Sequence, residues 1–292
     1  MSATMTTTIG RHAVTRVGLG GAGFSIGETQ HDNAAVAVIR AAHDAGITHF
    51  DTARAYATVE DPFHNERIFA RAVGGLDVLI ATKGGHFRSG RESWGIDASP
   101  DALRRDCEGS LRALGVDTIG LYYMHHPDPD VPIEDSVGTL SELRAEGKIE
   151  EIGVCNVDAA LLERALATTD IAAVQNRFSP FGANDTDVLQ RCAAAGIAHV
   201  AYSPLSGRPL YPSLGDLLPN TVRLARQRQH SVESMLLTWL LKLSPTMSVL
   251  SGAGREASAI DSASAVTIDL DEESFVIITD EISANAYPTP RR

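Results

Sequence analysis

The feature that most constrains the fold of this chain is a repeated unit in which a helix-like segment ends at a glycine and a short apolar run follows. Four glycines stand where such a helix would end in the left-handed conformation: Gly46, Gly115, Gly147 and Gly196. Alternation of short apolar runs with helical segments is typical of βα units around a parallel sheet. Four such repeats favour a barrel over an open sandwich or a helical bundle.

Eight apolar or β-rich runs have the length of a buried strand. They are Val17–Leu19, Thr48–Phe50, Val78–Ala81, Ile119–Met124, Ile152–Val154, Ala173–Gln175, His199–Tyr202 and Ser248–Leu250. Eight units predict an α/β fold of the (β/α)8 TIM-barrel class, with a parallel eight-stranded sheet and the active site at the C-terminal face. A doubly wound open sheet is the alternative.

Helix-period segments lie between these runs. They are Asn33–Ala45, Asn65–Ala72, Pro100–Leu114, Ile133–Glu146, Ala159–Thr168, Asp185–Ala195 and Ser231–Leu243. Because no low-complexity linker divides the 292 residues, we expect a single barrel domain over residues 1–292. The threonine-rich residues 1–8 lack a basic start and an apolar core, so we expect a disordered terminus there and no signal peptide. The longest irregular stretches, Gly84–Asp97 and Leu205–Leu214, each follow a strand.

Charge and cysteine content exclude several classes of function. The net charge of −12 would repel nucleic acid and anionic membrane surfaces. The longest nearly apolar run, Met235–Leu243, is far shorter than the roughly 20 residues of a membrane span. Cys107, Cys155 and Cys192 are odd in number and widely spaced, which argues against a disulfide framework and favours a reducing cytoplasm. No long apolar seam stands out, so we expect a monomer.

Four polar residues follow three consecutive predicted strands. They are Asp51 and Tyr56 after the second strand, Lys83 after the third and His125 after the fourth. Each alone has an ordinary structural interpretation, such as a helix cap, a solvated charge or a packing residue. In a parallel barrel, however, the C-terminal ends of strands meet at one face, so we expect the four side chains to share one cleft.

The chemistry of carbonyl reduction explains why these residue types belong together. A carbonyl that accepts hydride becomes an alkoxide and needs a proton, and a tyrosine with a pKa near 10 is a poor acid or base unless its phenolate is stabilised. Lys83 would favour the phenolate of Tyr56, and Asp51 would keep Lys83 charged. His125 could hydrogen-bond the substrate oxygen and orient it.

The sequence resembles the aldo-keto reductase superfamily, in particular its bacterial short-loop members, from about Arg16 to Ser262. The segments that carry the resemblance are HFDTARAYATVEDPFHNERIF, LIATKGG, GLYYMHHPDP, GKIEEIGVCNV, AVQNRFSPF and VAYSPLSG. The resemblance implies a (β/α)8 barrel, an NAD(P)H cofactor and a catalytic tetrad of Asp51, Tyr56, Lys83 and His125. It selects His125 over His126, because the family pattern places the histidine two residues before a Pro-Asp pair.

A metal site is the alternative interpretation of this histidine pair. Histidine and carboxylate side chains are good ligands, and His125 and His126 stand close to Asp128 and Asp130. Proline follows His126 and restricts the geometry, and a nicotinamide reductase needs no metal. We therefore expect none.

The cofactor site is predicted mainly by the resemblance. The glycine-rich run VGLGGAG lets backbone approach a ligand, although no helical pattern follows it. The resemblance places Gly21 under the nicotinamide, Asn156 and Gln175 on the carboxamide, Tyr202 on the ring face, and further residues along the pyrophosphate and adenosine. These further residues are Ser203, Leu205, Ser206, Arg208, Gly252, Ala253, Gly254, Arg255 and Ser258.

Two departures from the family pattern affect these expectations. Cys155 replaces the serine that usually precedes Asn156, and it could be an oxidisable thiol if exposed. Near the C-terminus, Ser251 replaces a proline, while Ser258 and Ser262 replace the glutamine and asparagine that contact adenine. Arg255 remains as a cation for a 2′-phosphate. NADPH is the cofactor that the family implies, and NADH stays open.

The substrate is predicted to be a small aldehyde or ketone that touches the loop after the third strand. Phe24, His86, Phe87 and Trp94 are the candidate walls, since aromatic side chains suit an apolar or planar carbonyl compound. Two other functions remain open at this stage. One is a nucleotide-binding regulatory barrel without significant turnover, and the other is a lyase or isomerase that uses Lys83 as a Schiff-base amine.

Overall fold

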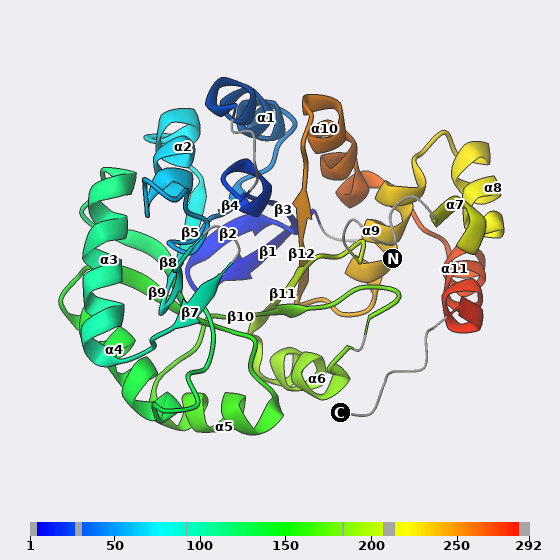
Figure 1. Cartoon of the computed structure of the whole chain (residues 1–292). Coiled ribbons are helices and arrows are strands. Elements are labelled where there is room, and N and C mark those ends of the chain that lie inside the picture. The colour runs from blue at the N-terminus through cyan, green and yellow to red at the C-terminus, as the bar shows by residue number, and fades with distance from the viewer. Residues whose placement is uncertain (1–4, 27–30, 91–92, 183, 207–213, 286–292) are drawn as a thin grey trace.

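The computed structural model describes residues 5–26, 31–90, 93–182, 184–206 and 214–285, and its central feature is a closed barrel of eight parallel strands (Figure 1). The strands are β3 (Val17–Gly20), β4 (His49–Asp51), β5 (Leu79–Gly84), β8 (Ile119–Met124), β9 (Ile149–Cys155), β10 (Ala173–Arg177), β11 (Ala198–Tyr202) and β12 (Met247–Gly252). Each overlaps one of the eight predicted runs. The (β/α)8 barrel is confirmed, and the doubly wound sheet is excluded.

Helices surround the barrel, one after each strand. They are α1 (Asp32–Asp44), α2 (His64–Val73), α3 (Pro100–Leu114), α4 (Ile133–Ala145), α5 (Ala159–Thr168), α6 (Thr186–Ala195), α9 (Val232–Lys242) and α10 (Glu256–Ser264). The first seven match predicted segments. Their ends follow the sequence signals: Ser99 caps α3 by accepting a hydrogen bond from Ala102, and Gly115 and Gly196 end α3 and α6 with φ of 69°. None of the helices in the described ranges has the length and apolar content to span a bilayer.

Four α-helices of the described residues lie outside the predicted set: α10, which follows β12, and the additional helices α7 (Leu214–Leu217), α8 (Pro219–Gln227) and α11 (Glu272–Asn285). The three additional helices lie together. With α9 they form the group at the right of Figure 1. The buried carboxylate of Glu281 on α11 accepts hydrogen bonds from the backbone of Asn220 at 2.7 Å and Thr221 at 2.8 Å. It satisfies backbone N–H groups that the first turn of α8 leaves free.

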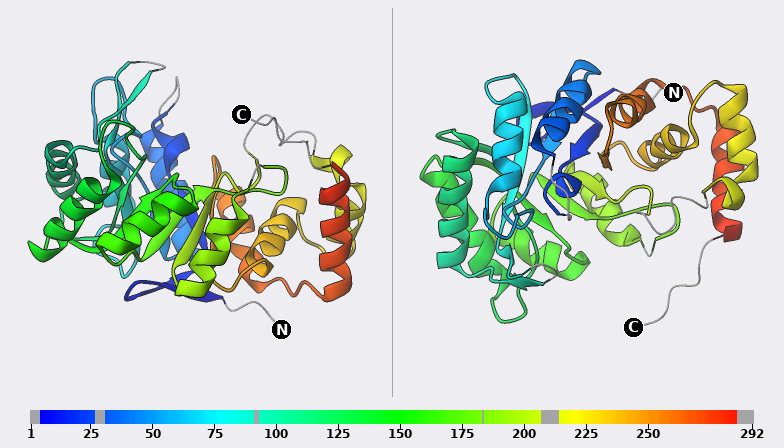
Figure 2. Two further views of the ribbon diagram at one scale, coloured as in Figure 1. Left: turned by 90° about the horizontal axis from the view of Figure 1, so that it is seen from below. Right: turned by 45° about the horizontal axis from the view of Figure 1, so that its top comes forward.

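The bottom of the barrel is closed by a hairpin of β1 (Thr6–Ile9) and β2 (His12–Thr15). Ile9 and Val14 pack on the side chains that fill the barrel, including Leu121 and Val200. In the left view of Figure 2 the hairpin lies at the lower end of the molecule. The expectation of a disordered terminus over residues 1–8 is therefore wrong for Thr6–Thr8, because apolar residues on either side of the turn are buried against the barrel.

The first and last strands close the ring. Val17 pairs with Val249 in the parallel register between β3 and β12. The buried guanidinium of Arg16 donates hydrogen bonds to the carbonyl oxygens of Met247 at 3.0 Å and of Leu241 and Ser244, each at 2.6 Å. The start of β3 is thus fixed to the last βα unit.

The loop Gly84–Asp97, expected to be irregular, contains a second hairpin. β6 (His86–Arg88) pairs with β7 (Trp94–Ile96), and the backbone N–H of Ser89 donates to the carbonyl of Ser93 at 2.9 Å. This hairpin extends the chain after β5 at the C-terminal face of the barrel. It brings His86 over the strand ends, while Trp94 and Ile96 are exposed.

Candidate active site

A buried ion pair lies at the C-terminal ends of β4 and β5. Lys83 Nζ contacts Asp51 Oδ1 and donates a 2.9 Å hydrogen bond to the carbonyl of Thr52. Both charged side chains are almost completely buried. Burial alone would lower the pKa of Lys83, but the charge of Asp51 and the hydrogen bond to its carboxylate outweigh burial and raise this pKa. Lys83 is therefore a protonated ammonium.

Tyr56 lies next to this pair. Lys83 Nζ is 4.9 Å from the centre of its ring, and the ring of His125 meets it edge to face at 5.7 Å. Burial raises the pKa of Tyr56 to about 12, and Lys83 acts in the opposite direction. The lysine thus favours the phenolate as expected, but desolvation is the larger effect. Tyr56 carries its proton at neutral pH.

His125 follows β8 and is buried beside Tyr56. Burial lowers the pKa of His125 well below its usual value, and the charge of Lys83 adds to this effect. The imidazole is therefore neutral and can donate a hydrogen bond from one ring nitrogen. All four predicted catalytic residues come together at the C-terminal face.

Arg54 is a residue of this site that sequence reasoning missed. Its Nε lies 3.2 Å from Asp106 Oδ1, and its guanidinium stands over the ring of Phe87 at 5.6 Å. Asp106 Oδ2 in turn accepts a hydrogen bond from the backbone of Gly85 at 3.1 Å. This network ties the segment that carries Tyr56 to the segment after β5. The sequence signal that could have indicated Arg54 is its position two residues before Tyr56.

The three residues expected at the nicotinamide end are Asn156, Tyr202 and Gln175, and all three form side-chain hydrogen bonds. Asn156 donates from Nδ2 to the carbonyl of His125 at 2.9 Å, and its Oδ1 accepts from the Tyr202 hydroxyl at 2.8 Å. Gln175 donates from Nε2 to Asp51 Oδ2 at 2.7 Å. Asn156 and Tyr202 are partly exposed, whereas Gln175 is buried. In this structure Gln175 fixes the second oxygen of Asp51.

The loop after β11 contains Ser203, Leu205 and Ser206, while Arg208 lies outside the described residues. Ser203 and Ser206 have φ of 51° and 65°, and the Ser206 hydroxyl donates to Ser179 Oγ at 3.0 Å. Sequence reasoning missed Arg177, the last residue of β10. Its exposed guanidinium donates to the Ser206 carbonyl at 3.4 Å and so places a cation beside this loop.

The segment after β12 holds the residues expected near adenosine. Gly252, Gly254 and Arg255 are exposed, and Arg255 is the N-cap residue of α10; Ala253 is buried and Ser258 is half-buried. The hydroxyls of Ser251 and Ser262 lie 2.7 Å apart and are buried. Ser251 and Ser262 both depart from the family pattern, and their hydroxyls form a hydrogen bond with each other.

The candidate substrate walls are only partly brought together. His86 approaches His125 and His126 with ring centres 4.8 Å and 4.6 Å apart. Phe87 packs under Arg54, and Phe24 packs on Phe69 at 6.1 Å. Trp94 stands 39% exposed at the tip of the β6–β7 hairpin, under the guanidinium of Arg88. Among the predicted walls, His86 is thus the one whose ring contacts that of His125.

The alternative metal site, in which Asp128 and Asp130 would join His125 and His126 as ligands, is wrong, because the two aspartates do not lie with these histidines. The Asp128 carboxylate accepts hydrogen bonds from the backbone of Ala98 at 3.1 Å and of Asp130 at 2.9 Å. Neither aspartate belongs to the cluster of potential ligand atoms that the described residues contain, which consists of His86, His125 and His126.

All three cysteines are buried. Burial raises the pKa of Cys155 well above its usual value and that of Cys107 and Cys192 to about 12. These thiols therefore stay protonated at neutral pH. Cys155 is not the exposed, oxidisable thiol considered from the sequence.

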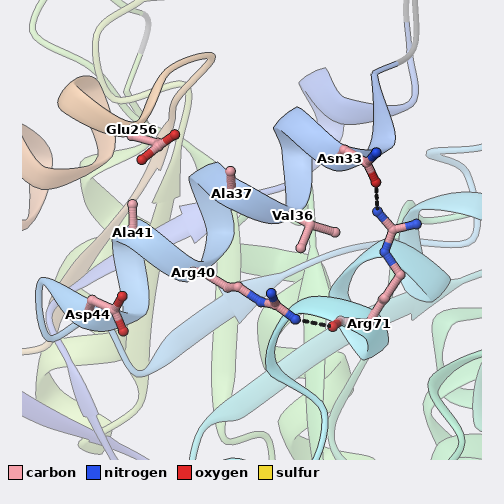
Figure 3. Close-up of a pocket in the computed structure, with 8 residues that line it drawn as sticks. All are labelled: Asn33, Val36, Ala37, Arg40, Ala41, Asp44, Arg71 and Glu256. Carbon is pink, nitrogen blue, oxygen red and sulfur yellow. Dashed lines mark hydrogen bonds between the residues drawn. The ribbon is translucent and has the colours of Figure 1, made fainter.

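A pocket of about 640 Å³ opens on the outer surface, away from the catalytic group (Figure 3). It lies between α1, α2 and α10 and is lined mainly by α1. Its two arginines are engaged: Arg40 donates to the carbonyls of Ala72 at 3.3 Å and Arg71 at 3.2 Å, and Arg71 donates to Asn33 Oδ1 at 2.7 Å. This pocket contributes nothing to the catalytic centre.

Comparison with known proteins decides the family. The model of the Aldo/keto reductase family matches residues 16–282. The chain belongs to the aldo/keto reductase family. It is 30% identical to aldo-keto reductase str7 of Strobilurus tenacellus, across 97% of this chain and 93% of that protein.

Solved structures agree with this assignment. Glycerol dehydrogenase AKR11B4 of Gluconobacter oxydans matches with a TM-score of 0.85 at 25% identity, over 100% of this chain and 98% of that one. An aldo-keto reductase of Klebsiella pneumoniae in complex with NADPH matches with a TM-score of 0.80 at 26% identity, over 99% and 97%. As a member of the aldo/keto reductase family, this chain is an oxidoreductase that acts on small-molecule carbonyl compounds.

Proposed function

We propose that this aldo/keto reductase reduces aldehydes or ketones to alcohols with a nicotinamide cofactor, and that Tyr56 is the proton donor. The observation that carries the proposal is the assembly of Tyr56, Lys83, Asp51 and His125 at the C-terminal ends of β4, β5 and β8. A protonated phenol lies there between a buried ammonium and a neutral imidazole. A carbonyl oxygen bound between the phenol and the imidazole could receive hydrogen bonds from both.

Each residue has a separate task in this reaction. When bound, a nicotinamide cofactor would supply the hydride that the carbonyl carbon accepts. Tyr56 transfers its hydroxyl proton to the oxygen as negative charge develops there. His125 orients the oxygen, and Lys83 stabilises the phenolate that Tyr56 becomes. Asp51 keeps Lys83 charged and in place. In the reverse direction the phenolate would accept the alcohol proton.

The residues around the strand ends fit a dinucleotide. Asn156, Gln175 and Tyr202 supply amide groups and an aromatic ring at the nicotinamide end. Arg177 and Arg255 are exposed cations suited to phosphate. Around Gly252 and Gly254 no atom of the described residues lies within 4 Å of the position that a side chain would take, so this backbone offers space for adenosine. Arg255 favours NADPH, in agreement with the cofactor named for the Klebsiella structure, and NADH is the alternative.

Two rival functions are less well supported. A Schiff-base lyase needs an unprotonated lysine amine, whereas Lys83 is ion-paired and its pKa is raised. A regulatory barrel that binds nucleotide without turnover would have no use for a buried tyrosine, lysine and aspartate in catalytic order. The reductase accounts for all of these residues.

The test is turnover by a Tyr56→Phe variant. We expect loss of carbonyl reduction by about 10²–10⁴-fold, because the phenol is the proton donor, with cofactor affinity nearly unchanged. NADPH and NADH oxidation would be followed against a panel of aldehydes and ketones, and affinity by fluorescence titration. Tyr122→Phe is the matched control, since it removes a buried hydroxyl that makes no hydrogen bond to the described residues. Undiminished turnover by Tyr56→Phe would refute the assignment.

A further inference from the structure

Three imidazoles converge at the mouth of the catalytic site. His86, His125 and His126 each offer a ring nitrogen, and these nitrogens all lie within 4.8 Å of one another. They come from two segments, the β6–β7 hairpin and the end of β8. The rings of His125 and His126 stack with centres 5.0 Å apart, and His86 meets both nearly edge-on. No carboxylate is part of this cluster.

Two of these three histidines carry a ring nitrogen without a hydrogen-bond partner among the described residues. Nδ1 of His125 and Nδ1 of His86 are buried and make no hydrogen bond to any described residue. The whole His125 side chain is 7% exposed. Because a buried polar atom without a partner is costly, such nitrogens point to a ligand that the protein binds. A metal ion or a hydrogen-bonding group would satisfy them.

We propose that His86, His125 and His126 form a binding site for a divalent transition metal, with Zn²⁺ as the ion that the site fits best. Three imidazoles with an open fourth position form a known type of zinc coordination. Tetrahedral ligands at about 2.0–2.1 Å from zinc lie roughly 3.3 Å apart, so the widest separation must shrink by about 1.5 Å. His86 and His126 are only half-buried, so we expect movement of these two side chains to supply the adjustment.

The charges around the cluster permit a dication. Within the part of the chain that the structure describes, the cations that act on these imidazoles are Lys83 and Arg54. Each is paired with a carboxylate, Lys83 with Asp51 and Arg54 with Asp106 at 3.2 Å. The local repulsion on an incoming metal ion is therefore reduced. Neutral nitrogen ligands favour zinc, copper or nickel over magnesium or calcium.

Occupation of this site would have a consequence for catalysis, which rests on the proposed function. A metal bound to His125 would withdraw this imidazole from the substrate oxygen that it is proposed to orient, and the ring of His125 lies only 5.7 Å from that of Tyr56. Zn²⁺ would then act as a reversible inhibitor that competes with the carbonyl substrate. Chelation would restore turnover.

The binding test is independent of turnover. Chelator-treated protein without a polyhistidine tag would be titrated with Co²⁺, whose visible absorption reports tetrahedral coordination, and the Co²⁺ would then be displaced with Zn²⁺. We expect one metal per chain. His86→Ala and His126→Ala should each weaken affinity by at least about tenfold. His230→Ala removes an exposed histidine at the end of α8 and serves as the control.

The outcomes separate clearly. Loss of the tetrahedral spectrum in both cluster variants, with the control unchanged, supports the site. Absence of Co²⁺ binding by the native chain, or equal affinity in all variants, overturns it. Circular dichroism and thermal melting check each fold, and His126→Ala carries the test if His86→Ala does not fold. Carbonyl reduction by metal-free protein is measured separately, so a failure of the proposed function is not confused with a failure of this site.

Discussion

Lys83 Nζ contacts Asp51 Oδ1 in an ion pair that is buried on all sides, and Gln175 holds the second carboxylate oxygen at 2.7 Å. A buried pair of this kind is broken at high cost when one partner is removed, because the other charge stays in the interior. The residues proposed to be catalytic are therefore also a structural element of the barrel.

The first prediction concerns this pair. Lys83→Met should lower the free energy of unfolding by about 3–5 kcal/mol, since Asp51 is left charged and uncompensated. The double variant Lys83→Met, Asp51→Asn should recover most of the loss, because no buried charge remains. Urea denaturation at pH 7 measures both. Equal stability of the single and double variants would contradict the argument.

The second prediction concerns pH and the buried carboxyl of Glu66. Burial raises the pKa of Glu66 from 4.5 to about 7, with Thr82 donating a hydrogen bond at 2.6 Å as partial compensation. Because the folded state holds the proton more tightly than the unfolded state, the stabilisation is fully present below pH 4.5 and is lost as pH rises through 7.

Glu66→Gln should therefore be more stable than the native chain at pH 8, by up to about 3 kcal/mol, and nearly equal to it at pH 4. Thermal or urea unfolding across this range gives the difference. Glu60→Gln, at an exposed loop position, is the control and should show no such pH dependence. A Glu66→Gln difference that does not change with pH would show that the carboxyl titrates normally.

The third prediction addresses cofactor preference. Arg255→Ala should raise the KM for NADPH by about tenfold or more and leave that for NADH unchanged, because a charge-assisted hydrogen bond contributes about 1.5–3 kcal/mol. Arg177→Ala should raise the KM for NADPH and for NADH alike, since both cofactors contain the pyrophosphate. Arg226→Ala, an exposed arginine of α8, is the control. Equal effects of Arg255→Ala on both cofactors would remove the assigned role.

The fourth prediction concerns Ser251 and Ser262, whose hydroxyls pair at 2.7 Å. Either serine changed to alanine should cost about 1–3 kcal/mol, because the remaining hydroxyl is buried without its partner. The double variant should cost less than the sum of the singles. A double-mutant cycle by urea unfolding measures the coupling, and additivity within about 0.5 kcal/mol would mean that the pair is not coupled.

The sequence predicts the barrel well because each βα unit carries its own local signals. Buried strands such as Ile119–Met124 are apolar throughout, and Ser99 with Pro100 marks a helix start at the observed residue. The α11 segment was missed because its valine, isoleucine and threonine residues favour strands, and packing against α8 and α9 makes it helical. The β1–β2 hairpin was missed although Gly10, with φ of 56°, follows a β-branched run.

The candidate site was predictable in part for a similar reason. Asp51, Lys83 and His125 follow strand ends, so the barrel alone brings them together. The role of Arg54, the position of Gln175 against Asp51 and the approach of His86 to His126 depend on side-chain packing between distant segments. Local sequence patterns do not contain this information. The monomeric state and the cytoplasmic location stay predictions.

The seam between β3 and β12 determines when the fold can be completed. Val17 of β3 pairs with Val249 of β12. During synthesis the first barrel strand therefore leaves the ribosome long before the strand that it pairs with. Until then β3 carries an open edge, which is a site for association with other chains. The hydrogen bonds from Arg16 to Leu241, Ser244 and Met247 can form only at that late stage. A chain that stops before residue 247 therefore lacks the strand that covers β3 and keeps an unpaired strand edge.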